Sequence, residues 1–458
     1  MIGKPFPRKI AEKKMEQLLH YTWRHKLFPL GPLHTTDGQP VEIVDVGLHN
    51  HDAGPDFFNA KVKIDGQLFV GNVELHLRSS DWYLHRHEQD AAYDNVILHV
   101  VEQANQEVQT HAGRTLPQLE IHVPSTIRQR YAELLRTDHY PPCYAAIPNL
   151  SRLTVHAWMS ALQTERLERK TQDILRRVEQ CNGDWEQAWF VSLARYFGFG
   201  VNNDAMEQWA LSIPLQQLAH VGDDLFQIEA FFYGQAGLLH TEAVPQRYRS
   251  AVEHDEYFLR LQREFQFQQV KYHLQPIDHH LWRFLRLRPQ NFPHVRLSQL
   301  ASLAHQQHTR LAQMVAATTL KELRQLFRAE TTEYFHTHYL FGHASPRSPK
   351  TLSVASVDLL LINTAIPMLF AYGRHRSDEA LCERAFQLLD SLRAEDNHIV
   401  RMWRECGLEV QTAGDSQALI QLKREYCDRR DCLRCRFAFE FLRNSAPHPS
   451  PLTEAGDN

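Results

Sequence analysis

A change in hydrophobic period divides this chain into two parts and constrains its fold more than any other feature. Between residues 41 and 123, apolar and polar residues alternate in short runs, as they do in half-buried β-strands. From Ser151 almost to the end, apolar residues recur at helical spacing with few β-branched runs. The pair Pro141-Pro142 marks the junction. The sequence therefore predicts an α+β fold, with an N-terminal α/β core followed by a large all-α region.

The N-terminal part is predicted to have the order helix, three strands, short helix and two further strands. An amphipathic helix is expected over 12–27, where apolar residues recur every three or four positions. Asp65-Gly66 is a hairpin signal between the second and third strands. The expected strands are 41–46, 60–64, 68–77, 95–101 and 119–123, with a helical segment at 82–93.

The chain of 458 residues is too long for one hydrophobic core, so more than one domain is expected. We predict an α/β domain over 1–140, a helical domain over 141–444 that ends in a cysteine cluster, and a disordered polar tail over 445–458. The predicted segments of the helical domain include 153–178, 185–197, 225–239, 248–268, 297–316 and 377–394.

Composition indicates a soluble cytoplasmic protein with no membrane partner. The formal net charge of -4 creates no global field that would attract nucleic acid or a membrane. The N-terminus lacks the apolar core of a secretory signal, and the most apolar stretch, 354–372, is interrupted by polar residues and Pro367. Seven cysteines, an odd number, fit a reducing compartment better than a disulfide framework.

Two carboxylates and a histidine lie on neighbouring predicted strands. Asp56 begins one strand and Glu74 lies on its hairpin partner, so both carboxylates can reach one ion. His76 shares the face of Glu74 because side chains alternate along a strand. A divalent ion such as Mg²⁺ or Mn²⁺ activates water and offsets phosphate charge. We therefore predict Asp56, Glu74 and His76 as the catalytic residues of a metal site.

Additional ligands follow the strand that carries Glu74. His85, His87 and Asp90 are predicted to complete or support the metal site with Asp56 and Glu74. Imidazole ligands would favour Mn²⁺, Zn²⁺ or iron over Mg²⁺. His99 lies in a strongly apolar strand and is interpreted as a core histidine. The alternative for the whole stretch is a plain hairpin, with the aspartate capping a turn and the glutamate paired with a basic residue.

The motif resembles the PD-(D/E)xK nuclease superfamily. Pro55-Asp56 is followed after seventeen residues by Glu74-Leu75-His76, in the strand order described above. The resemblance covers only the N-terminal part and implies hydrolysis of phosphodiester bonds in DNA or RNA. Histidine stands where the superfamily has lysine, and Lys61 or Lys63 could substitute if either side chain points into the site.

Nearly the whole chain also resembles an uncharacterised bacterial family that is described only as a domain of unknown function. The resemblance implies a single evolutionary unit and carries no activity. Its motifs are Gly54-Pro-Asp-Phe-Phe-Asn-Ala60, Gly71-Asn-Val-Glu-Leu-His76, Ser80-Asp-Trp82, Tyr93-Asp-Asn-Val-Ile-Leu-His-Val-Val101, Tyr233-Gly-Gln-Ala-Gly237, Arg286-Leu-Arg-Pro-Gln-Asn-Phe-Pro293 and the terminal cysteines.

Three cysteines near the C-terminus predict a second metal site. Cys427, Cys432 and Cys435 are spaced closely enough to bind Zn²⁺ or an iron–sulfur cluster, and both normally take four ligands. The predicted site includes Cys143 as the fourth ligand, because it would join the two ends of the protein, while Cys406 is nearer in sequence. We expect a structural role. The alternative is a set of unligated thiols.

One segment has the features of a nucleic-acid surface. Residues 279–321 contain no Asp or Glu, and aromatic residues are interleaved with arginines. Arginine matches phosphate geometry and aromatic rings stack on bases. The predicted contacts are Arg283, Arg286, Arg288 and Arg296. The alternative is an internal ion-pair network with acidic helices elsewhere in the chain.

Three functions are compatible with these features. The first is a metal-dependent nuclease that acts on DNA or RNA, with Asp56 and Glu74 on the ion. The second is a catalytically inactive nucleic-acid-binding or scaffold protein with a degenerate nuclease core, in which the change to His76 marks the loss of activity. The third is hydrolysis of a non-nucleic substrate at a histidine and carboxylate site that holds a transition metal.

Overall fold

A computed structural model describes residues 8–28, 31–50 and 52–443, so the predicted disordered tail 445–458 lies outside the described residues. The chain forms two compact units. The sheet unit comprises Met1–His156 with Leu422–Asn458, and the helical unit comprises Ala157–Gln421. The predicted α+β class is confirmed. We grouped the C-terminal cysteine segment with the helical domain, but it belongs to the sheet unit. Local periodicity could not predict this, because the contacts of the segment are made with residues far away in the sequence.

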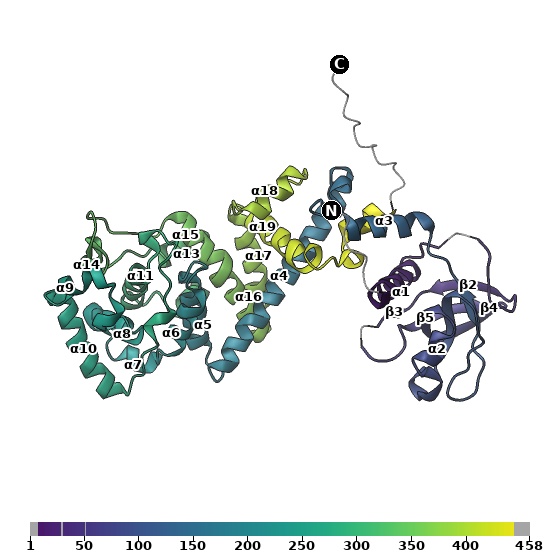
Figure 1. Ribbon diagram of the computed structural model, residues 1–458, viewed down its shortest axis with the longest axis horizontal. Helices are drawn as coiled ribbons and strands as arrows, with labels where there is room; N and C mark the ends of the chain where they lie inside the picture. Colours follow the sequence, from purple (N-terminus) through teal and green to yellow (C-terminus); the bar gives the residue numbers. More distant parts are fainter. Residues whose placement is uncertain (1–7, 29–30, 51, 444–458) are drawn as a thin grey trace, which may run out of the picture. The chain divides into compact units, whose positions relative to one another are not determined.

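The sheet unit is built on a seven-stranded sheet (Figure 1). The strands are β1 (Leu33–His34), β2 (Pro40–Asp45), β3 (Leu48–His49), β4 (Phe57–Ile64), β5 (Gln67–Arg78), β6 (Val96–Gln103) and β7 (Gln118–Glu120). The order is β1-β2-β4-β5-β6-β7, with β3 also paired to β4. Pairs up to β5 are antiparallel, whereas β5, β6 and β7 are parallel. Asp65 and Gly66 both have positive φ at the β4–β5 turn, as the hairpin signal predicts.

Short helices surround this sheet. Helix α1 (Arg8–Arg24) packs on β5, and α2 (Asp81–Leu84) with the turns η1 (His87–Gln89) and η2 (Ala91–Tyr93) connects β5 to the parallel strand β6. Helix α3 (Ser125–Arg136) follows β7 and packs against α20 (Arg436–Arg443) from the C-terminal segment. The predicted order of helix, strands, short helix and strands is confirmed. The added strands β1 and β3 have two residues each, too few to show alternation.

The helical unit contains mainly helices with one small hairpin. Its first half has α4 (Arg152–Gln180), which starts in the sheet unit, α5 (Trp185–Phe197), α6 (Asn203–Leu211), α7 (Leu215–Ala219), α8 (Leu225–Gln235), α9 (Arg249–Val252), α10 (Glu256–Tyr272) and α11 (Pro293–His305). Its second half has α12 (Leu311–Ala316), α13 (Leu320–Leu326), α14 (Glu333–His336), α15 (Val354–Leu360), α16 (Ile366–Arg376), α17 (Glu379–Ser391), α18 (His398–Glu405) and α19 (Ala413–Gln421). The predicted helix over 248–268 is divided, because the Asp255 carboxylate caps α10 at the amides of Tyr257 and Phe258. Strands β8 (His338–Leu340) and β9 (His343–Ala344) qualify the all-α expectation.

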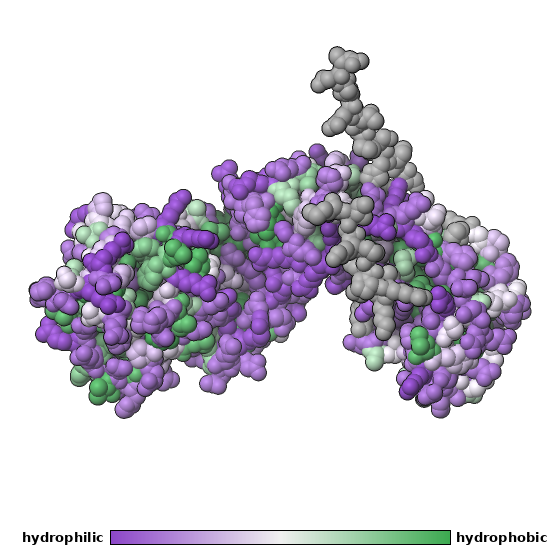
Figure 2. Space-filling model, viewed as in Figure 1, coloured by the Kyte–Doolittle hydropathy of each residue, from purple (hydrophilic) through white to green (hydrophobic). Residues whose placement is uncertain are grey.

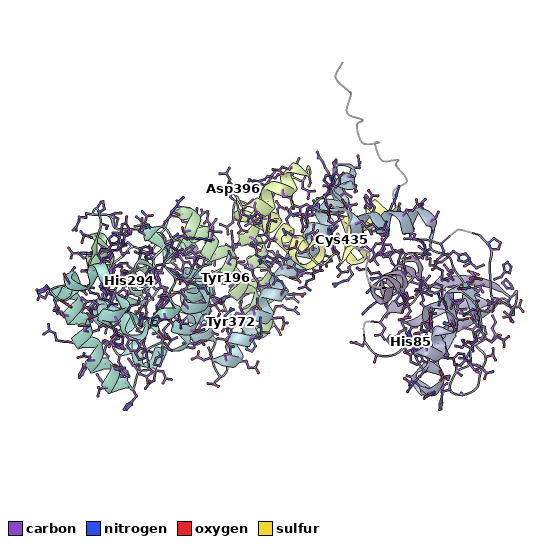
Figure 3. All side chains as sticks on the ribbon, viewed as in Figure 1. His85, Tyr196, His294, Tyr372, Asp396 and Cys435 are labelled. Carbon is purple, nitrogen blue, oxygen red and sulfur yellow. The ribbon has the colours of Figure 1, made fainter. Side chains whose placement is uncertain are left out.

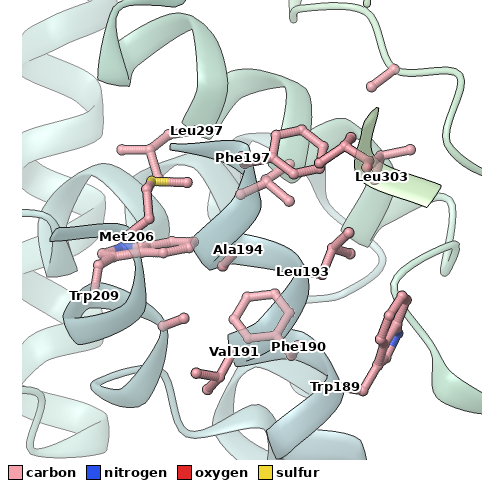
Figure 4. Packing of buried hydrophobic residues seen from close by; sticks show 14 of the residues in the cluster. Trp189, Phe190, Val191, Leu193, Ala194, Phe197, Met206, Trp209, Leu297 and Leu303 are labelled. Atoms are coloured by element: carbon pink, nitrogen blue, oxygen red, sulfur yellow. The ribbon is translucent and has the colours of Figure 1, made fainter. Parts of the chain in front are cut away.

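The core of the helical unit is formed by helices that are buried on all sides. Trp189, Phe190 and Phe197 of α5 belong to this core, and the Phe190 ring lies 5.9 Å from that of Trp209 of α6 (Figure 4). Helix α8 is buried over most of its length, and a Cβ atom added at its Gly234 would lie 2.0 Å from the Phe265 ring of α10. Glycine therefore lets these two helices approach closely, as helices hydrophobic all round require.

One helix is long and apolar enough to cross a membrane, Val354–Arg376. It is continuous through the π-helical turn Leu361–Ala365, which contains Asn363 and ends two residues before Pro367. Of its most apolar 18-residue window, 67% is buried inside the protein. The visible surface in Figure 2 is mostly hydrophilic with scattered apolar side chains. Most of this apolar helix thus belongs to the core of the helical unit.

Glu229 of α8 gives the helical unit a pH-dependent stability. The carboxyl is buried, it accepts hydrogen bonds from Thr332 (2.6 Å) and from the Tyr257 hydroxyl, and burial raises its pKa to about 7. Because the folded-state pKa is raised, the stabilising contribution is present at low pH and is lost as pH rises through 7. We expect Glu229→Gln to reduce the fall in unfolding free energy between pH 5 and pH 8 by an amount on the order of 3 kcal/mol. Denaturant unfolding at both pH values measures this.

The exposed Glu253→Gln serves as the control for that comparison and should leave the pH profile as it is. A Glu229→Gln profile identical to that of the unmodified protein would contradict the expectation.

Candidate metal centre

The two predicted carboxylates lie together at the β4–β5 pair. Asp56 immediately precedes β4, and the pairing of Phe57 with Val73 sets it beside Glu74. The Asp56 amide donates to Glu74 Oε2 at 3.0 Å, and the Leu75 amide donates to Asp56 Oδ2 at 2.9 Å. Each carboxylate is therefore oriented by the backbone of the neighbouring strand.

Three histidines cluster beside Glu74, and two of them lie against its carboxylate. His76 follows it on the same face of β5, and His85 and His87 come from the segment after α2; Figure 3 labels His85. His76 Nε2 lies 3.1 Å from His85 Nδ1 and 3.7 Å from Glu74 Oε1, and His87 Nε2 lies 3.2 Å from the same oxygen. One ring nitrogen of each histidine lies within 4.8 Å of the others.

This donor set fits a transition-metal ion. Nitrogen ligands at the corners of a tetrahedral zinc site lie about 3.3 Å apart, given Zn–N bonds near 2.0 Å. His87 is 9% exposed, and its Nε2 makes no hydrogen bond within the described residues although it faces Glu74. An ion held between this nitrogen and the Glu74 carboxylate would give both groups a ligand bond. Three imidazoles with a carboxylate favour Mn²⁺, iron or Zn²⁺ over Mg²⁺.

The electrostatics of the cluster favour the metal-binding protonation state of its histidines. Burial lowers the pKa of His76 well below its usual value, reinforced by neighbouring histidines, and burial lowers that of His87 to about 4. Burial also raises the pKa of Asp56 to about 6 and that of Glu74 well above its usual value. Neutral imidazole is the form that binds a metal. A divalent ion would offset the cost of burying both carboxylates.

His99, which we interpreted from the sequence as a core histidine, also contacts the cluster. His99 is fully buried on β6, in register with Glu74, and its Nε2 lies 2.9 Å from His76 Nδ1. A partner on the far ring nitrogen fixes the orientation of a ligating imidazole. The Tyr93 ring stacks on that of His87 at 3.9 Å.

Two residues of α1 belong to the site and were missed. His20 Nε2 lies 3.5 Å from Asp56 Oδ2, and the Glu16 pKa is raised by burial, with His20 and Asp56 among the charges that act on it. Glu16 and His20 are four residues apart and so share one helix face. A polar pair at that spacing beside the buried Leu18 and Leu19 was the available signal.

Other predicted residues lie away from the cluster. Asp90 is exposed and its carboxylate accepts the Ala92 amide at 2.9 Å, so it caps a turn, although its charge favours protonation of His87. Lys61 is exposed, and Lys63 Nζ is paired with Glu42 at 2.9 Å. Neither lysine therefore takes the position of the lysine in the nuclease motif.

The predicted cysteine set is brought together within the sheet unit. Cys143 precedes the turn Tyr144–Asn149, which packs on α20, and Cys435 immediately precedes α20. All four thiols are buried, and the pKa of Cys143 is raised by burial and then by Cys435, Cys427 and Cys432. Among the residues that the structure describes, no three of these sulfurs lie within 4.8 Å of one another. Sulfurs around a single zinc ion lie about 3.8 Å apart. Cys406 belongs to the helical unit.

The predicted arginine surface is only partly at the surface. Arg283, Arg286 and Arg288 are exposed, and no ion pair involves them in the described part of the chain, which disfavours the ion-pair alternative. Arg296 is instead buried on α11, where its guanidinium donates to Gln299 at 2.8 Å and covers a phenylalanine ring. Arg296 therefore has an internal packing role, and we correct its assignment as a nucleic-acid contact.

These features define an α+β protein with a buried histidine and carboxylate cluster in its sheet unit. The chain belongs to the family described as "Protein of unknown function (DUF2851)", whose model matches residues 16–398. The match includes the metal-centre residues and ends before the C-terminal cysteines. No curated protein and no solved structure matches the chain.

Proposed function

We propose that this protein is a metal-dependent hydrolase that cleaves phosphodiester bonds in DNA or RNA. The observation that carries the proposal is the convergence of Asp56, Glu74 and His76, the residues of the nuclease-like motif, at one point of the sheet. A protein that used these residues only to close a hairpin would have no reason to bury two carboxylates against each other. The cytoplasm, which keeps thiols reduced, is the proposed compartment.

Each residue has a role in this proposal. Glu74, His76 and His87 hold the ion, with His85 at its exposed side. Asp56 supplies the second carboxylate. A bound ion would lower the pKa of a coordinated water and offset charge on the phosphate. His20, which lies beside Asp56, is placed to orient that water. The exposed Arg283, Arg286 and Arg288 are proposed to contact nucleic acid from the helical unit.

The ion is proposed to be Mn²⁺ or Zn²⁺ in preference to Mg²⁺. Three imidazoles and one carboxylate make a softer donor set than the oxygen ligands that Mg²⁺ prefers. The four cysteines are proposed to hold a separate structural centre, either a zinc ion or an iron–sulfur cluster, because both are normally held by four ligands.

A second candidate function is supported by the cavity beside His85. This cavity, of about 640 Å³, is lined by Glu16 and His85 and is rich in carboxylates. Its acidic residues are Glu12, Glu16, Asp81, Glu102 and Glu120, and its basic ones include Arg78 and Arg128. An acidic entrance disfavours a polyanion. Hydrolysis of a neutral or cationic substrate at the same ion is therefore the alternative.

A metal screen on the full chain tests the function. Protein stripped with a chelator would be loaded with Mg²⁺, Mn²⁺ or Zn²⁺ and incubated with single-stranded DNA, duplex DNA and RNA. Cleavage that depends on Mn²⁺ or Zn²⁺ supports the proposal. Binding without cleavage in every metal would favour the inactive nucleic-acid-binding protein. Neither binding nor cleavage would favour the non-nucleic hydrolase.

Removing one histidine should weaken metal binding. His87→Ala deletes a ligand, and we expect the affinity for Zn²⁺ to fall by at least about 100-fold, since even the loss of a supporting outer-shell group costs 10–100-fold. Isothermal titration of stripped protein measures this. Asp90→Ala is the matched control, because Asp90 is a near neighbour in sequence but caps a turn. Equal losses in both variants would contradict the ligand assignment.

A further inference from the structure

A positively charged pocket shares His20 with the surroundings of the metal centre. It lies between α1 and the C-terminal cysteine loop, residues 427–435, and has a volume of about 450 Å³. Its cationic lining residues are Lys14, Arg24, Arg429, Arg430 and Arg434, and Asp431 is the carboxylate among the lining residues. Within one pocket this charge balance is strongly positive, although the whole chain is slightly negative.

The arginines of the pocket divide into anchored and available groups. Arg430 donates to the carbonyl oxygens of Leu134 at 2.9 Å and Thr137 at 3.0 Å, so it fixes the cysteine loop. Arg434 contacts Asp431 at 3.2 Å, and Arg429 contacts Glu425 at 2.6 Å. Arg24, in the last turn of α1, is exposed and takes part in no ion pair within the described residues. Its charge is therefore available to a ligand.

The rest of the lining is compatible with an anionic ligand. Tyr21 contributes a largely buried aromatic side chain to the pocket wall. Cationic side chains that line one pocket are the chemistry that recognises phosphate.

His20 connects this pocket to the proposed reaction centre. It lines the pocket, and its Nε2 lies 3.5 Å from Asp56 Oδ2. The cavity beside His85 has the opposite character, because carboxylates predominate among its charged lining residues. A nucleic-acid strand would thus be attracted to the cationic pocket and excluded from the acidic cavity.

We propose that the cationic pocket binds a backbone phosphate of the nucleic-acid strand whose neighbouring phosphodiester reaches the metal centre. This inference rests on the proposed function and identifies where its substrate is held. It also gives the cysteine centre a purpose, because the loop that carries the thiols presents Arg429, Arg430 and Arg434 to the pocket.

Binding without cleavage tests the pocket separately from the reaction. Glu74→Gln protein, free of metal, would be titrated with a fluorescent single-stranded oligonucleotide by anisotropy at several salt concentrations. Adding Arg24→Gln is expected to weaken binding by about tenfold and to lower the salt slope by about one. Lys13→Gln is the matched control, an exposed cation on the same helix outside the pocket lining.

Each outcome has one meaning. A loss in Arg24→Gln with Lys13→Gln unchanged supports the pocket, provided that circular dichroism shows both variants folded. Equal losses for Arg24→Gln and Lys13→Gln would reduce the effect to general surface charge and overturn it. If inorganic phosphate or a mononucleotide binds to the pocket and the oligonucleotide does not, the occupant is not a nucleic-acid strand, and the proposal is overturned. If binding depends on the pocket but no metal supports cleavage, the proposed hydrolysis is refuted and the proposed pocket is retained.

Discussion

Glu74→Gln is expected to abolish metal-stimulated cleavage of nucleic acid while leaving the fold intact. The glutamine keeps an oxygen that can accept the Asp56 amide but loses the charge that holds the ion. Losing a catalytic ion removes several kcal/mol of transition-state stabilisation. That corresponds to a fall in rate by a factor of roughly 10³ or more. Single-turnover cleavage with Mn²⁺ or Zn²⁺ measures it, and Asp56→Asn should have the same effect.

Stability provides the second readout of this variant. Glu74 is buried beside Asp56, and their mutual repulsion is one cause of its raised pKa. A neutral side chain relieves that repulsion, so thermal unfolding of Glu74→Gln should occur at or above the temperature of the unmodified protein. Glu42→Gln, an exposed carboxylate on the neighbouring strand β2, is the control and should retain cleavage. Cleavage that survives in both Glu74→Gln and Asp56→Asn would refute the proposed nuclease.

Cys143→Ser is expected to empty the cysteine centre and to destabilise the sheet unit. Ligands contributed by two distant segments make metal binding part of the folding free energy. Its loss should lower stability by several kcal/mol, because structural metal sites of this kind contribute about 10 kcal/mol or more in small domains. Elemental analysis, sulfide assay and visible absorption give the occupancy, and calorimetry gives the unfolding of each unit.

Cys406→Ser is the matched control for the cysteine centre, since Cys406 lies in the helical unit and was the alternative fourth ligand. It should retain the metal. Iron with a similar amount of sulfide, about four of each per chain, would identify a cluster. One zinc per chain would replace the cluster by a single ion. Metal-free protein with unchanged stability in Cys143→Ser would leave four buried thiols and no centre.

Local periodicity predicted most of the fold because it is a property of neighbouring residues. The alternation around β4 and β5, the Asp65-Gly66 turn and the helical spacing after residue 151 all led to elements that the structure contains. Boundaries failed where a side chain acts locally, as at Asp255, which caps α10 and divides one predicted helix into two. Such caps are detectable in the sequence but compete with an uninterrupted apolar pattern.

The candidate metal centre was predictable only in part. Asp56, Glu74 and His76 could be placed together because they lie on paired strands whose register follows from a short turn. Glu16 and His20 approach from a helix whose docking the sequence does not reveal. Arg296 shows the opposite error, because an arginine in an acid-free segment looks like a surface residue until its burial between Gln299 and Phe199 is known.

The return of the chain to the sheet unit at Leu422 has a consequence for biosynthesis. The helical unit is an insertion within the sheet unit, so the ribosome must complete all of it before α20 and three of the four clustered cysteines exist. The strands of the sheet unit leave the ribosome first, and α20, which belongs to the same unit, is synthesised last. A nascent chain that ends near Gln421 would therefore contain the complete helical unit but an incomplete sheet unit. We expect the incomplete sheet unit, although it is synthesised first, to be the part that needs protection from aggregation.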